Sequence, residues 1–425
     1  MIPTAWILLT TPLPTAADLA SDPASDPASD PAPERAPERA PLLASGSPPG
    51  LHRMDAPLPP RPTRLTASPR APAARELGTP TTLYVNFDGI ELSECNPSRS
   101  QDNCHWYNVG ETIAPFSGSV QTKVSVLQAM RRDVDEYGIR VTGQRPDPSE
   151  AYTMVVYGGT EERFGALGSA PSGDCGDQSP SQIAFAHLDG ALVEWVNGGA
   201  TTALHEAAHS WGLDHIQTER SIMFPSGDDE PNAFRGECAP VVTDVNLSPG
   251  PASCPEFNAV HCEGDDLQNA RALLGQLFGG PYVDTQAPTV DLVEPADGQY
   301  FQAPADFDVV LEIRDDLHPQ VYDASFWLND EPKPQARPFL EDRFAVTGLP
   351  VGTWAFHVEL TDEAGNATRL DFEIEVGEDP PPEPGGDDGG CAVGGPRWAR
   401  SAGGVSGPLG LVVLLLCVAR RRHPR

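Results

Sequence analysis

Three histidines at fixed spacing carry the clearest chemical signal in the sequence: His205, His209 and His215. On a helix, His205 and His209 lie one turn apart on the same face, so both imidazoles can bind one zinc ion. Glu206 lies beside that face, where its carboxylate can reach a water molecule at the metal. Three neutral nitrogen ligands leave a fourth coordination position open, as in catalytic rather than structural zinc sites. The pattern therefore predicts one catalytic zinc ion (Zn2+).

The element that positions these residues must end before the third histidine, because His215 has to return to the same metal ion. Gly212 lies three residues after His209 and predicts that end, since glycine adopts a left-handed backbone conformation without strain from a Cβ atom. We therefore expect a helix that begins near Gly198 and Gly199 and ends at Gly212.

Residues 201–225 resemble the metzincin clan of zinc endopeptidases, because the signature HExxHxxGxxH is matched at every fixed position. Ser221-Ile222-Met223 resembles the Met-turn of this clan, and the following Phe224-Pro225 is most similar to the matrixin branch. The resemblance implies that Glu206 is the general base and acid and that Met223 forms the floor of the site. The zinc ligands that it implies are His205, His209 and His215.

This sequence departs from the clan in two places. No cysteine-switch segment lies upstream of the domain, so latency by a prodomain thiol is not expected. Pro225 stands two residues after Met223, so a tyrosine ligand of the astacin type is not expected either. The function implied is a zinc-dependent endopeptidase that hydrolyses peptide bonds of extracellular proteins, with Glu206 acting on a zinc-activated water. The alternative is a surface adhesin whose metal domain is catalytically inert, which the intact Glu206 disfavours.

The composition narrows the range of partners. The chain has 425 residues, a net charge of -33 and a pI near 4.5. Such a chain repels nucleic acid and anionic lipid, so no nucleic-acid partner is expected and the expected partner is a protein or peptide substrate. Calcium (Ca2+) is compatible with this acidity, but no loop has the spacing of a calcium site.

Six cysteines lie in the presumed catalytic region, and an even set in an exported protein predicts disulfides. They are Cys95, Cys104, Cys175, Cys238, Cys254 and Cys262. The short separations favour Cys95–Cys104 and Cys254–Cys262, which leaves Cys175 with Cys238. This connectivity is one of about fifteen that six cysteines allow.

The fold expected around the site is an α+β metzincin-like catalytic domain of residues 79–283, with a mixed sheet and an active-site helix. Alternation of apolar and polar residues then predicts an all-β immunoglobulin-like sandwich over residues 287–377, and the stretch 360–367 resembles bacterial immunoglobulin-like domains. The elements expected in the catalytic domain are strands at 82–87, 139–141, 152–157 and 182–187 and helices at 120–137 and 267–278. Residues 165–181 are expected to be irregular, and the strand at 182–187 marks the candidate edge for extended substrate.

The two ends of the chain predict export. Residues 1–17 are expected to be a signal peptide, and residues 18–78 a disordered proline-rich segment that is either a passive spacer or a propeptide. Residues 378–425 are expected to be a linker and a C-terminal tail. Gly389-Gly390-Cys391, the apolar run 407–419 and the basic run 420–422 resemble the sorting signal of myxobacterial surface proteins.

That resemblance implies processing and lipid attachment at Cys391 by a sorting protease. The plainer alternative is that the apolar run is a permanent membrane anchor. Either reading places the protein outside the inner membrane, at the cell surface (outer membrane) or secreted after tail processing.

Overall fold

The structure is a computed structural model of the chain. It describes residues 52–54, 76–95, 97–106, 112–161, 165–171, 174–264, 266–329, 331–340 and 342–379. The expected signal peptide and the expected processing residue Cys391 lie outside these ranges. Among the described residues, no helix has both the length and the apolar character that crossing a lipid bilayer requires.

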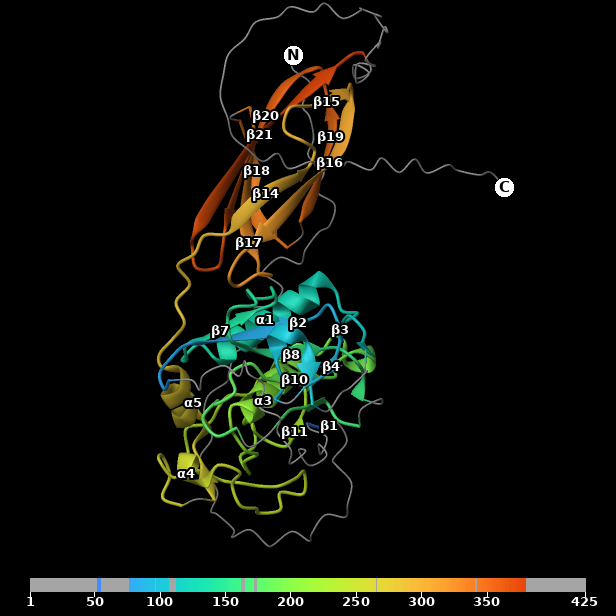
Figure 1. Cartoon of the computed structure of the whole chain (residues 1–425). Coiled ribbons are helices and arrows are strands. Elements are labelled where there is room, and N and C mark those ends of the chain that lie inside the picture. The colour runs from blue at the N-terminus through green and yellow to red at the C-terminus, as the bar shows by residue number, and fades with distance from the viewer. Residues whose placement is uncertain are drawn as a thin grey trace, which may run out of the picture. The chain divides into compact units, whose positions relative to one another are not determined.

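A five-stranded sheet organises the first half of the described chain (Figure 1). Its strand order is β7-β2-β8-β10-β9, and all neighbours are parallel except β9, which runs antiparallel to β10. The mixed sheet expected from the sequence is therefore present. Its strands are β2 (Thr81–Asn86), β7 (Ile139–Thr142), β8 (Tyr152–Tyr157), β9 (Gly168–Ser169) and β10 (Ile183–Ala186).

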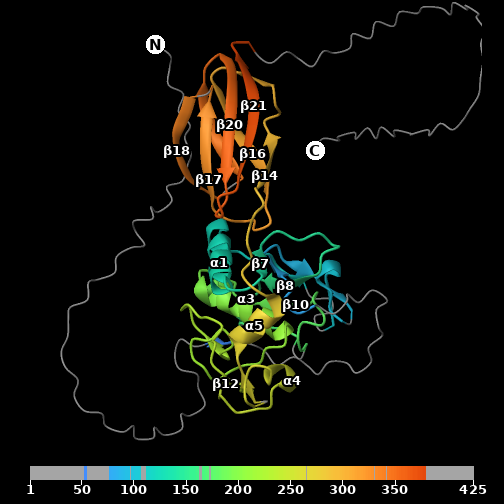
Figure 2. The ribbon, with the colours of Figure 1, turned by 90° about the vertical axis from the view of Figure 1, so that its left-hand side faces the viewer.

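Both faces of this sheet are covered, as is usual for parallel strands. On one face, Leu83, Val155 and Ala184 join a core with the apolar residues of helices α1 (Val120–Asp133) and α3 (Asn197–Ser210). On the other face, Tyr84 and Phe185 pack with a smaller apolar cluster. Figure 2 shows α1 and α3 on the same side of the sheet, where they pack against each other. The sheet therefore supports the helix that carries the histidines.

Two helix boundaries differ from the sequence prediction. The first helix ends at Asp133, because Val134 has a non-helical backbone (φ -120°, ψ 14°). The last helix, α5 (Ala270–Phe278), begins later than expected, because Leu267–Gln268 forms strand β13 and Asn269 caps the helix by accepting the Ala272 amide.

The edge strand for extended substrate was predicted wrongly. The strand at 182–187, observed as β10, is internal, because β9 pairs with it on the outer side. β9 lies in the glycine-rich stretch that was expected to be irregular, and glycine lowers the strand propensity of such a segment.

Short strand pairs and helices complete this half of the chain. His52–Arg53 forms β1, within the segment expected to be disordered, and pairs antiparallel with β11 (Ser226–Gly227). The other elements are β3 (Ile90–Glu91), β4 (Ser93–Glu94), β5 (Cys104–His105), β6 (Thr112–Ile113), β12 (Ala239–Pro240), α4 (Pro255–Asn258) and the 3-10 turns Ser100–Asp102 and Gly190–Leu192.

The second half is an all-β sandwich, which confirms that part of the sequence prediction. One sheet has the order β14-β16-β19 and the other β15-β21-β20-β17-β18. Their inner faces share one apolar core, in which Phe356 and Phe372 stack at 4.8 Å between ring centroids. The strands are β14 (Thr289–Glu294), β15 (Gln299–Gln302), β16 (Ala305–Arg314), β17 (Tyr322–Leu328), β18 (Glu331–Phe339), β19 (Arg343–Leu349), β20 (Gly352–Thr361) and β21 (Ala367–Gly377).

All six predicted cysteines form disulfides, but the predicted pairing is right only for Cys95–Cys104. The other two bonds are Cys175–Cys254 and Cys238–Cys262, with Cα–Cα distances of 5.4 and 5.7 Å. Helix α4 begins directly after Cys254 and separates it from Cys262. The two cysteines are therefore close in the sequence but do not bond to each other.

Candidate metal centre

Helix α3 carries the first two histidines and ends as the sequence predicted. The Gly212 amide donates to His209 O (3.1 Å) and the Leu213 amide to Ala208 O (3.0 Å), which is a Schellman arrangement. Gly212 has φ +100°, and a Cβ atom there would lie 2.7 Å from the carbonyl oxygen of Asp174. Only glycine satisfies both conditions, and the chain then turns back toward the helix.

This turn brings the three histidines together. Their Nε2 atoms form a triangle with sides of 2.9 Å (His205 to His209), 3.1 Å (His205 to His215) and 3.2 Å (His209 to His215). All three side chains are buried. Nitrogen ligands of one zinc ion lie about 2.0–2.1 Å from the metal, so three converging imidazole nitrogens at these separations fit a single zinc ion.

Two backbone carbonyls fix the orientation of the imidazoles. His205 Nδ1 lies 2.6 Å from Ile222 O, and His209 Nδ1 lies 2.7 Å from Leu213 O. A carbonyl oxygen only accepts, so each Nδ1 carries the proton and each Nε2 presents its lone pair to the centre of the triangle. These carbonyl groups were not predicted, because a backbone acceptor has no residue-type signal.

The third histidine is suited to the neutral form that a metal ligand needs. Burial, with smaller effects of His209 and Arg53, holds the pKa of His215 well below its usual range. A neutral imidazole has no proton to lose when it binds a metal ion.

Glu206 is buried beside this triangle, on the turn of α3 that carries His205. Its side chain lies against the backbone of Gly168 in β9, where a Cβ atom on Gly168 would approach Glu206 Cγ to 2.6 Å. The missing side chain at Gly168 thus makes room for the carboxylate. The arrangement places one carboxylate between the histidine triangle and the edge of the sheet.

Met223 is fully buried in the tight turn expected there. The Phe224 amide donates to Ser221 O (3.0 Å), and the Met223 amide donates to Ser221 Oγ (3.2 Å). Met223 O in turn accepts the amide of Ile216 (2.9 Å), next to the third histidine. This bond ties the turn to the segment that carries His215.

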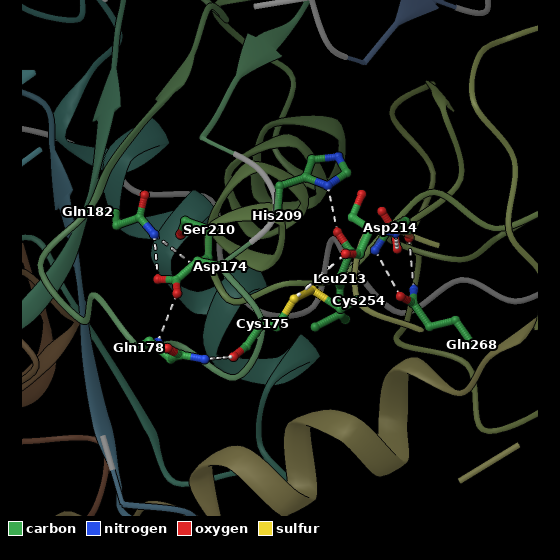
Figure 3. Close-up of a disulfide and its surroundings, with 11 residues drawn as sticks. Asp174, Cys175, Gln178, Gln182, His209, Ser210, Leu213, Asp214, Cys254 and Gln268 are labelled. Atoms are coloured by element: carbon green, nitrogen blue, oxygen red, sulfur yellow. Dashed lines mark hydrogen bonds between the residues drawn. A yellow bond between two sulfur atoms is a disulfide. The ribbon is translucent and has the colours of Figure 1, made fainter. Parts of the chain in front are cut away.

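The Cys175–Cys254 disulfide lies next to the end of α3 (Figure 3). The neighbouring Asp174 side chain accepts hydrogen bonds from Gln182 Nε2 (2.6 Å) and from the amides of Gln178 (3.0 Å) and Ser179 (2.9 Å). Gln182 Nε2 also donates to Ser210 O, the last residue of α3 (3.2 Å). The disulfide therefore holds a loop that packs on the helix end at Gly212.

Sequence reasoning missed Gln268, which positions the segment before His215. Its Oε1 accepts the amide of Asp214 and its Nε2 donates to Asp214 O, both at 2.8 Å. The Asp214 carboxylate also accepts the Ser253 amide at 2.8 Å, one residue before Cys254. A buried glutamine in β13, far along the sequence from the motif, offers no local pattern by which to find it.

A second group of acidic side chains lies at the entry to the sandwich. Because Thr289 pairs with Arg314, the chain before β14 runs past the residues after β16, and this brings Asp284 within 4.8 Å of Asp315 and Asp316. Burial and then the neighbouring Asp316 raise the pKa of Asp315 to about 7. Burial also raises the pKa of Asp284. No sequence motif marked this group, and calcium stays an expectation without a motif.

Comparisons with known proteins bear only on limited parts of the chain. No family model and no curated protein matches it. Fibronectin(III)-like modules of Clostridium thermocellum CbhA are similar over 21% of this chain and 98% of theirs, with 16% identity and a TM-score of 0.19. PKD domains of human KIAA0319 and of the KIAA 1837 protein are similar over 22% and 24% of this chain and 83% and 97% of theirs, with 16% and 17% identity and TM-scores of 0.16 and 0.17.

Proposed function

We propose that the protein is a zinc-dependent endopeptidase. The observation that carries the proposal is the convergence of the Nε2 atoms of His205, His209 and His215 to within 3.2 Å, with the buried carboxylate of Glu206 on the same helix. A structural zinc site has no use for that carboxylate. The resemblance of residues 201–225 to metzincins supports the same assignment.

Each residue of the site has a role in this proposal. The three histidines would hold the ion, and Ile222 O and Leu213 O orient two of them. When bound, zinc supplies Lewis-acid chemistry, which polarises a peptide carbonyl and brings the pKa of water near neutrality. Glu206 accepts the proton of the attacking water and later delivers it to the leaving amine. Met223 and its turn keep the segment carrying His215 in place.

Export and partners belong to the same proposal. Three disulfides support an oxidising compartment, where such bonds persist. We place the protein at the cell surface or in the secreted fraction, attached to the membrane through the tail until a sorting protease processes it at Cys391. Its partner would be a protein or peptide substrate.

The test is zinc content together with cleavage of quenched peptides by the full chain, with and without a chelator. Bound zinc and chelator-sensitive cleavage are expected. Zinc that is bound without cleavage of any peptide in a broad library, both by the wild type and by a chain in which residues 52–54 are displaced, would instead favour the adhesin alternative, in which the metal domain is inert and the sandwich binds the partner.

A further inference from the structure

The segment His52–Met54, far upstream of the histidine motif, lies as a strand between two backbone segments of the site. On one side, the amides of Leu167 and Gly168 donate to Arg53 O (2.9 Å) and Met54 O (2.7 Å). On the other side, the Met54 amide donates to Pro225 O (3.2 Å), and His52 and Arg53 pair with Gly227 and Ser226. The segment thus completes a three-stranded arrangement whose outer strands belong to the site.

Both outer strands are attached to the residues of the proposed reaction. Gly168 of β9 lies against the side chain of Glu206. The segment 225–227 directly follows the turn that contains Met223. A groove can bind an extended peptide by main-chain hydrogen bonds, so that the peptide becomes an added strand. A peptide held in this way between the two outer strands passes beside the histidine triangle.

The side chain of Met54 fills a pocket in this groove. Met54 is fully buried and belongs to the same core as Leu167 and the apolar residues of α3. Its sulfur atom lies 3.9 Å from Thr202 Oγ1, one helical turn before Glu206. It also lies against Gly227, where a Cβ atom would be 2.6 Å from the sulfur. The pocket is thus bounded by α3 on one side and by β11 on the other.

The flanking residue His52 holds the segment in place. Its Nδ1 lies 2.6 Å from Glu161 Oε2, and its ring meets that of Trp195 edge-on at 5.0 Å between centroids. The segment is therefore fixed by backbone bonds on both edges, by an apolar side chain and by a polar one. A groove that binds a peptide by adding a strand uses the same kinds of contact.

We propose that His52–Met54 occupies and blocks the peptide-binding groove of the enzyme. The segment also indicates the class of substrate that the enzyme accepts, which is an extended peptide with a long, unbranched apolar side chain, such as methionine, in the pocket between α3 and β11. This inference rests on the proposed peptidase function. The contacts of residues 52–54 involve no thiol.

The test uses the full chain with Met54→Asp, Met54→Leu and, as a matched control, Leu77→Asp, which alters an exposed side chain (54% exposed) in the same upstream region. A charge in an apolar pocket without a partner carries a high desolvation cost, so Met54→Asp should leave the groove. Leucine has nearly the volume of methionine and should stay. Hydrogen exchange at the Leu167 and Gly168 amides reports occupancy of the groove independently of activity.

We expect exchange at these two amides to be at least about tenfold faster in Met54→Asp than in the wild type, Met54→Leu or Leu77→Asp, since backbone hydrogen bonds govern local protection. Cleavage of a peptide library should rise in Met54→Asp by a similar factor, with methionine and leucine enriched at one position next to the cut bond. Unchanged exchange in folded Met54→Asp, equal cleavage by the wild type, or enrichment of charged residues would overturn the proposal. Faster exchange without cleavage in any variant would instead overturn the peptidase assignment and leave the segment placed in the groove.

Discussion

The buried side chain of Gln268 makes two hydrogen bonds of 2.8 Å to the backbone of Asp214, one with the Asp214 amide and one with the Asp214 carbonyl. Asp214 precedes His215, so a residue in β13 sets the path of the third proposed zinc ligand. We expect Gln268→Ala to lower the free energy of unfolding by roughly 1–3 kcal/mol, because a half-buried amide and carbonyl lose their partners.

The same substitution should weaken zinc binding by about tenfold, at the low end of the effect of removing groups that orient metal ligands. Chemical denaturation and competition with a chromophoric chelator measure the two effects. Gln217→Ala, at an exposed position near the same segment, is the control and should change neither. Zinc affinity unchanged in Gln268→Ala would show that His215 does not depend on this support.

The role of Glu206 predicts a separation of binding from catalysis. Glu206→Gln keeps the size of the buried side chain and removes its ability to accept a proton, so kcat/KM for peptide cleavage should fall by about 10²–10⁴. Zinc content and the melting temperature should stay close to those of the wild type. Glu219→Gln, on the exposed loop after His215, should retain full activity. Cleavage that survives Glu206→Gln would mean that another group moves the proton.

Removal of one corner of the histidine triangle should abolish metal binding. His215→Ala leaves only two imidazole ligands, and zinc retained after dialysis should fall from one ion per chain to less than about 0.1, because catalytic zinc sites use three protein ligands. Elemental analysis measures this value. His261→Ala removes a histidine that bonds to Gln276 away from the triangle, and it should leave the zinc content unchanged.

The corrected disulfide pairing makes a quantitative prediction. Cys175–Cys254 closes a loop with a sequence separation of 79, and Cys238–Cys262 one of 24. The chain-entropy relation then gives about 4.5 kcal/mol of stabilisation for the first bond and about 3.4 kcal/mol for the second. Double Cys→Ser variants, compared by denaturation, should show this order.

Only loss of the first bond should also weaken zinc binding, because that disulfide packs on the turn at Gly212 and on the Asp214 segment. Mapping of non-reduced peptides checks the pairing itself. A Cys175–Cys238 peptide would contradict the structure.

The raised pKa of Asp315 predicts a pH dependence of the sandwich. A carboxyl group whose folded-state pKa lies above its ordinary value near 3.8 contributes stability while it is protonated, and that contribution is lost as the pH rises from about 4 through about 7. The melting temperature of the full chain should therefore fall across this window by more in the wild type than in Asp315→Asn. Asp323→Asn, at an exposed position of β17, is the control. Parallel curves for the wild type and Asp315→Asn would contradict the shifted pKa.

Local patterns predicted much of this molecule. The spacing of His205, His209 and Gly212 specified a helix and its end, and alternation of apolar residues specified the sandwich strands. Elements that form only by pairing with residues far away in the sequence were not predicted. No sequence pattern predicts β9, because this strand is short and contains glycine. It nevertheless forms the edge of the five-stranded sheet beside Glu206.

The same limit explains the upstream segment and the disulfides. His52–Arg53 lies in a proline-rich region whose composition predicts disorder, and its structure comes from distant partners: the pairing with β11 and the backbone bonds to Leu167 and Gly168. Cys254 and Cys262 are close in the sequence, but α4 directs them to different partners. Backbone acceptors such as Ile222 O cannot be read from residue types at all.

The most direct measurement of the central claim is peptide cleavage by the full chain carrying Met54→Asp, taken as purified, after removal of metal by a chelator, and after return of zinc. The account predicts cleavage that disappears with the metal, returns with one zinc ion per chain, and is lower by about 10²–10⁴ when Glu206→Gln is added. A folded chain that binds no zinc, or cleavage that continues unchanged without metal, would contradict it.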